Sequence, residues 1–122
     1  MDTPTTSLAA YKAIIDQLVA ETRCGGAGLQ ITKRSVFSNA PAHREYNDFI
    51  RSLSAEQRAL LAWMLSDERD GTIHDVLAVL SWWISAREVG LTFRGEPMPT
   101  ELSGMGLHGD YVGRKDGWEW PR

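Results

Sequence analysis

The chain has 122 residues, of which 43% are hydrophobic and 24% charged. These are ordinary values for a globular protein and argue against disordered and fibrous classes. The length corresponds to one domain that can bury a core without disulfides. The net charge of −3 removes the usual electrostatic basis for binding nucleic acid or an anionic membrane, so we expect neither partner.

Three features indicate a cytoplasmic protein. The single cysteine, Cys24, cannot form an intramolecular disulfide, which fits a reducing compartment. Residues 1–4 lack the basic start and apolar run of a secretory signal. The longest nearly continuous apolar stretch, residues 76–84, is far shorter than the ~20 residues that cross a bilayer.

The first predicted helix covers residues 5–23. Pro4 suits its first turn, apolar residues recur at three- and four-residue steps, and Gly25 and Gly26 end it. Residues 25–38 form the least helical internal stretch. We expect an irregular loop there, with residues 29–31 as an alternative short edge strand.

Two further helices are predicted at residues 41–53 and 55–70. Ser38 or Asn39 is available to cap the first. Ser54 and Gln57 have the spacing of a capping box for the second, and Gly71 is expected to end it.

A fourth helix is predicted at residues 73–88, with a second capping box at its start and Gly90 at its end. Its apolar residues form two stripes, one made of Ile73, Val76, Leu77, Leu80 and Ile84, the other of Val79, Trp82, Trp83 and Ala86. A helix that is apolar on most sides is surrounded by other elements. It is therefore either the central helix of the domain or part of an oligomer interface.

The C-terminal segment, residues 90–122, is rich in glycine and proline. We expect it to wrap over the helices as ordered irregular structure, with a short strand at residues 91–93 and a turn or β-hairpin around Asp116 and Gly117. The predicted fold class is mainly α, a single compact four-helix domain with this glycine-rich segment.

The weak candidates for catalytic residues are His74, Asp75, His108 and Asp110. His74 and Asp75 lie in the first turn of the predicted helix 73–88, where a His–carboxylate pair could form a site. The simpler interpretation, which we favour, is that Asp75 caps the helix, because acidic residues are common in first turns.

The histidines also raise the question of a metal. His43, His74 and His108, together with Glu68, could converge only through folding, since no two have metal-ligand spacing on a helix. We therefore expect no metal and no cofactor.

Five tryptophans are the most unusual feature of the composition. We predict that Trp83 belongs to the core. Aromatic side chains also anchor interfaces and line ligand pockets. The candidates for an interface or pocket are Trp63, Val79, Trp82, and one of Trp118 and Trp120.

Two functional hypotheses follow. The first is a non-enzymatic interaction module that forms a homodimer through Val79, Trp82 and neighbouring aromatic residues. The alternative is a small-molecule or metal-dependent enzyme with a His/carboxylate site between the junction near Gly71 and the C-terminal loops. A weaker third idea is a basic protein partner attracted by the acidic cluster around Asp67 and Glu68.

Overall fold

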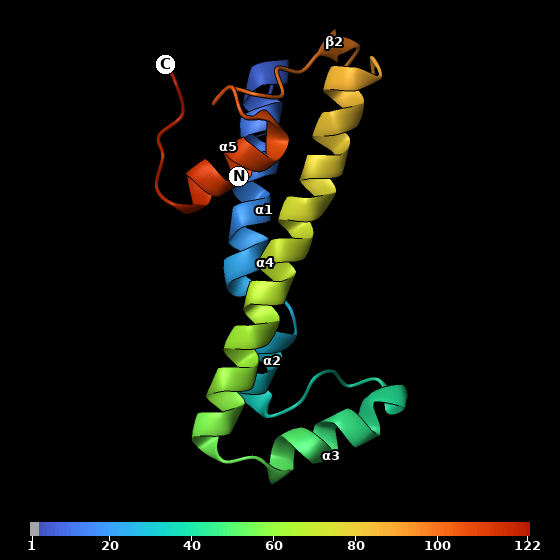
Figure 1. The fold of residues 1–122 in the computed structure, drawn as a ribbon, viewed down its shortest axis with the longest axis vertical. Coiled ribbons are helices and arrows are strands. Elements are labelled where there is room, and N and C mark those ends of the chain that lie inside the picture. The colour runs from blue at the N-terminus through green and yellow to red at the C-terminus, as the bar shows by residue number, and fades with distance from the viewer. Residues whose placement is uncertain (1–2) are drawn as a thin grey trace. The chain divides into compact units, whose positions relative to one another are not determined.

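The computed structural model describes residues 3–122 and confirms a mainly α fold (Figure 1). The elements in chain order are α1 (Ser7–Cys24), α2 (Ala27–Arg34), the 3₁₀ turn η1 (Pro41–His43), α3 (Arg44–Ser52), α4 (Ala55–Ala86), β1 (Thr92–Phe93), β2 (Glu96–Pro97) and α5 (Gly106–Lys115). Among these residues, no helix combines the length and the apolarity needed to span a bilayer.

The chain divides into two compact units. One consists of the residues up to Val19 together with Thr72–Arg122, and the other of Ala20–Gly71. The boundary falls inside both α1 and α4, so each of these helices contributes to both units.

The first unit has a core built from three helices. Tyr11, Ile15 and Val19 lie one turn apart on α1, at the spacing that places them on one helix face. They pack against Leu77 of α4 and against α5, which buries Leu107 and Tyr111. The periodicity that predicts the first helix therefore also identifies the face it buries.

The second unit has a smaller core, formed by Ile31 of α2, Ile50 of α3 and Ala62 of α4. The predicted capping box is confirmed at the start of α4. The amide of Gln57 donates to Ser54 Oγ at 3.1 Å, and the amide of Ser54 donates to Gln57 Oε1 at 2.9 Å.

The prediction of two helices separated at Gly71 is wrong, because α4 runs without interruption from Ala55 to Ala86. A glycine ends a helix when it adopts a left-handed backbone conformation, and Gly71 is not among the glycines that do so. A single glycine costs a helix only about 1 kcal/mol relative to alanine, which the surrounding residues offset. The expected second cap at Thr72 and Asp75 thus lies inside a continuous helix.

The loop or strand expected within residues 25–38 is largely replaced by α2. Gly28 permits this helix to approach α4 closely, because a Cβ at Gly28 would lie 2.5 Å from Ser66 Oγ and 2.7 Å from the carbonyl oxygen of Ala62. Gly28 therefore serves close helix packing, whereas Gly25 and Gly26 lie in the connection between α1 and α2.

Of the turn and the β-hairpin expected around Asp116 and Gly117, the turn is found and the hairpin is not, since α5 occupies Gly106–Lys115. Gly117, with φ of 94°, ends this helix. Its amide donates to the carbonyl of Arg114 at 3.2 Å, and the amide of Trp118 donates to the carbonyl of Gly113 at 2.8 Å. This is the Schellman pattern, so the Asp–Gly pair serves as a helix end instead of a hairpin turn.

The short strand expected at residues 91–93 is confirmed as β1. It pairs with β2 in an antiparallel hairpin, with Thr92 opposite Pro97 and Phe93 opposite Glu96. Arg94 and Gly95 form the connection, and both have positive φ, as a two-residue type I′ turn requires.

The continuity of α4 makes a prediction for Gly71. A Cβ at this position would meet nothing within 4 Å. The substitution Gly71→Ala should therefore raise the free energy of unfolding by about 0.5–1 kcal/mol, since alanine loses less backbone entropy in a helix. Urea denaturation followed by circular dichroism measures the change. A destabilised variant would show that the helix is interrupted at this residue.

Candidate functional site

The outward face of α4 in the first unit is strongly apolar. Leu77 is buried in the core, with Ile73 and Ile84 packed against it. On the other side of the helix, Val79 keeps 59% and Trp82 49% of its surface exposed to solvent. The two residues proposed for an interface are therefore not enclosed by the described part of their own chain.

Trp83 corrects an expectation, because it is 46% exposed and does not belong to the core. Its ring meets the Trp82 ring edge to face, with centroids 5.3 Å apart. The guanidinium of Arg87 lies 5.2 Å from the centroid of the Trp82 ring, a cation–π arrangement. The outward face, defined here as Val76, Val79, Leu80, Trp82 and Trp83, thus carries two adjacent indoles.

The other three candidate tryptophans differ in environment. Trp63 on α4 is 74% exposed in the second unit. Trp120 is half-buried, packs edge to face on Tyr11, and donates from Nε1 to Asp16 Oδ2 at 3.0 Å. Trp118 lines a cavity. Trp120 therefore supports the core of the first unit, whereas Trp118 contributes to a concave surface.

The cavity at Trp118 has a volume of about 470 Å³ and lies in the first unit. Its lining residues are His74, Ser103, Met105, His108, Gly109, Val112, Gly113 and Trp118. The fold brings together two of the catalytic candidates, because the rings of His74 and His108 are perpendicular with centroids 5.3 Å apart. This hollow, called the histidine cavity below, is lined by two imidazoles among mostly apolar residues.

The two imidazoles differ in their hydrogen bonding. His74 Nδ1 lies 3.2 Å from Asp75 Oδ1. A carboxylate only accepts, so Nδ1 carries the proton and, in a neutral ring, Nε2 keeps its lone pair. His108 Nδ1 is buried and has no hydrogen-bond partner. Such an unpaired atom costs about 1–3 kcal/mol, which sets His108 apart from an ordinary packed histidine.

The remaining candidates for metal ligands do not join this pair. His43 lies in the second unit, where its Nδ1 is 2.5 Å from Ser38 Oγ and its ring stacks on Tyr46. Glu68 also belongs to that unit. Within residues 3–122, and leaving aside the Cys24 side chain, no group of three or more His, Cys, Asp or Glu residues could hold a metal.

Asp110 does not line the cavity and instead holds the first unit together. Its buried carboxylate accepts hydrogen bonds from the hydroxyl of Tyr11, from the amide of Leu102 at 2.9 Å, and from the amide of Ser103 at 2.7 Å. Burial, and then the hydrogen bond and charge of Asp110, raise the pKa of the Tyr11 hydroxyl well above its usual value of about 10.

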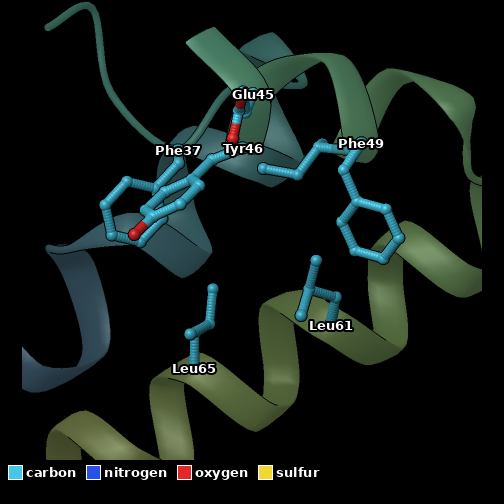
Figure 2. Close-up of a pocket in the computed structure, with 7 residues that line it drawn as sticks. Phe37, Glu45, Tyr46, Phe49, Leu61 and Leu65 are labelled. Atoms are coloured by element: carbon cyan, nitrogen blue, oxygen red, sulfur yellow. The ribbon is translucent and has the colours of Figure 1, made fainter. Parts of the chain in front are cut away.

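A second hollow, in the other unit, was missed by the sequence analysis. It has a volume of about 440 Å³ and is lined by Phe37, Glu45, Tyr46, Phe49, Ile50, Leu61 and Leu65. Figure 2 shows Phe49 directed from α3 toward Leu61, and Leu65 directed from α4 toward the rings of Phe37 and Tyr46. The apolar face of residues 41–53 predicts contact with other residues, but not that these side chains leave a hollow between them.

The sequence matches a family of unknown function (DUF6547) over residues 4–122, so the chain belongs to that family. No curated protein and no solved structure matches it.

The structural role of Asp110 leads to a stability prediction. Asp110→Asn removes the charge and replaces one carboxylate oxygen by an NH2 group that cannot accept, so at least one of the three donors loses its acceptor. The change should lower the free energy of unfolding by about 2–3 kcal/mol. Asp75→Asn is the control, because that carboxylate is 82% exposed and its loss should change stability by less than about 0.5 kcal/mol. Equal effects in chemical denaturation would contradict the assignment of Asp110 as a buried clamp.

Tyr11 leads to a prediction for alkaline pH. Above about pH 10 the unfolded chain loses the Tyr11 proton, whereas the folded chain keeps it because its pKa is raised. The unfolded state then binds fewer protons than the folded state. The contribution of Tyr11 to the free energy of unfolding therefore falls by about 1.4 kcal/mol per pH unit. Chemical denaturation of the wild type and of Tyr11→Phe between pH 8 and 11.5 measures this decrease. The difference between their free energies of unfolding should shrink above pH 10, and a constant difference would refute the prediction.

Proposed function

We propose that this member of a family of unknown function is a non-enzymatic interaction module that forms a homodimer through the outward face of α4. The observation that carries the proposal is the exposure of Val79, Trp82 and Trp83 on a helix whose opposite face is already packed. Contiguous exposed apolar surface of this kind marks interaction sites on soluble proteins.

The spacing of the outward-facing residues supports a helix as the partner. Thr72, Val76, Val79, Trp83 and Ala86 are exposed and follow one another at alternating four- and three-residue steps. This is the spacing that keeps one stripe of a helix against another helix. In a two-fold dimer the same stripe would serve both copies, so no second surface is needed.

The charges at the two ends of the stripe favour an antiparallel pair. Asp75 and Arg87 lie at equal distances along the chain on either side of Ser81. Two α4 helices that cross antiparallel at the level of Ser81 would bring Asp75 of each copy opposite Arg87 of the other. A parallel pair would bring like charges together instead, which destabilises an interface.

The size of the face indicates a weak dimer. Its exposed surface is on the order of 500 Å², near the upper end of the patches that monomeric proteins carry. Two copies would bury roughly 1,000 Å², close to the lower limit for specific interfaces. We therefore expect a concentration-dependent dimer with a dissociation constant in the micromolar range.

Sedimentation equilibrium in reducing buffer, at about 1–200 µM protein, tests the proposal. Val79→Glu should weaken dimerisation at least tenfold without unfolding the chain, because a charge would have to be buried at the centre of the interface. Val89→Glu is the matched control, since Val89 is also exposed but lies outside the stripe. A monomer throughout the range, or equal effects of the two variants, would refute the proposal.

A charge-swap experiment tests the antiparallel arrangement. Asp75→Arg alone should weaken dimerisation. The combination of Asp75→Arg with Arg87→Asp should restore much of the lost affinity. Failure of the double variant to dimerise more strongly than Asp75→Arg would exclude this geometry.

A further inference from the structure

We infer that the histidine cavity is a binding site for a neutral, planar aromatic small molecule that carries a hydroxyl or ring N–H donor, such as a hydroxylated bicyclic arene. This inference does not depend on the proposed dimer, since none of the residues that line the cavity belongs to the outward face of α4. Its volume of about 470 Å³ falls within the range typical of small-molecule sites.

The apolar walls of the cavity suit a flat ring. Trp118 presents an indole, Val112 an aliphatic wall, and Met105 a thioether that is largely exposed. Aromatic and thioether groups pack favourably against planar ligands.

Two glycines let the thioether and indole walls of the cavity lie close against α5. Gly109 and Gly113 lie one turn apart on α5 and both line the cavity. A Cβ at Gly113 would lie 3.2 Å from the Trp118 ring, and a Cβ at Gly109 would collide with Met105 at 2.4 Å. Glycine is a poor helix former, so its presence twice on this face is explained by space rather than by helix stability.

The polar groups of the cavity define the ligand's hydrogen bonding. The contact with Asp75 leaves the Nε2 of a neutral His74 as an acceptor, whereas His108 Nδ1 is buried and lies out of reach of a ligand in the cavity. A ligand hydroxyl or ring N–H can therefore donate to Nε2 of His74. None of the residues that line the cavity is a lysine or an arginine that could pair with an anionic ligand.

Binding can be measured with three probes of matched shape: 2-naphthol, 2-methoxynaphthalene and 2-naphthoate. NMR spectra of the histidine and tryptophan side chains report the site directly. We expect 2-naphthol to shift the signals of His74, His108 and Trp118 in a saturable way. The methoxy compound, which lacks the donor, should bind at least tenfold more weakly, and so should the naphthoate anion.

A variant tests the role of His74. His74→Phe keeps a ring in place but removes its nitrogens, and it should weaken 2-naphthol binding about tenfold. His43→Phe is the matched control in the other unit and should leave the affinity unchanged. Circular dichroism verifies that each variant is folded. The comparison of the three probes uses the wild-type protein, so it tests the inference even where a variant fails to fold.

Three results would overturn the inference. The first is equal affinity for 2-naphthol and its methoxy analogue, which would indicate a merely apolar surface. The second is tighter binding of 2-naphthoate, which would indicate an anion site. The third is the absence of saturable shifts at His74, His108 and Trp118 up to the solubility limit of 2-naphthol.

Discussion

The buried carboxylate of Asp110 is the interaction on which the first unit depends. It lies on α5, accepts from the Tyr11 hydroxyl of α1, and binds two amides of the segment that precedes α5. A buried carboxylate is costly unless donors surround it, and here three donors do so. The same group therefore fixes both the orientation of α5 against α1 and the path of the chain into α5.

This clamp has consequences for both proposed surfaces. Once α5 is held against α1, its Leu107 and Tyr111 complete a core in which α4 buries only Leu77 and its neighbours. The opposite side of α4 therefore stays exposed among the described residues of the first unit. The cavity also depends on the clamp, because His108 and Gly109 immediately precede Asp110 on the same helix and line it. Packing inside the unit thus creates the exposed face and the concave site together.

The sequence predicts helices well where apolar periodicity is strong and poorly where glycine is involved. The first helix and the capping box at Ser54 and Gln57 are both found as predicted. Glycine, by contrast, has several physical uses that look the same in a sequence. Gly28 permits close packing against α4, Gly71 lies within a continuous helix, and Gly117 ends one. Only the tertiary neighbours and the backbone conformation distinguish these cases.

The candidate sites show the same limit, because a side chain's function depends on which neighbours the fold supplies. The sequence singled out His74, His108 and Asp110 together, yet nothing local indicates that the first two meet across α4 and α5 while the third turns to Tyr11. The two apolar stripes of residues 73–88 show that one side of the helix exceeds what a small core can cover. The prediction that Trp83 belongs to the core is wrong, because its stripe is the one that stays exposed. Leu77 decides which side this is, since its burial against Tyr11 and Tyr111 leaves Val79, Trp82 and Trp83 facing outward.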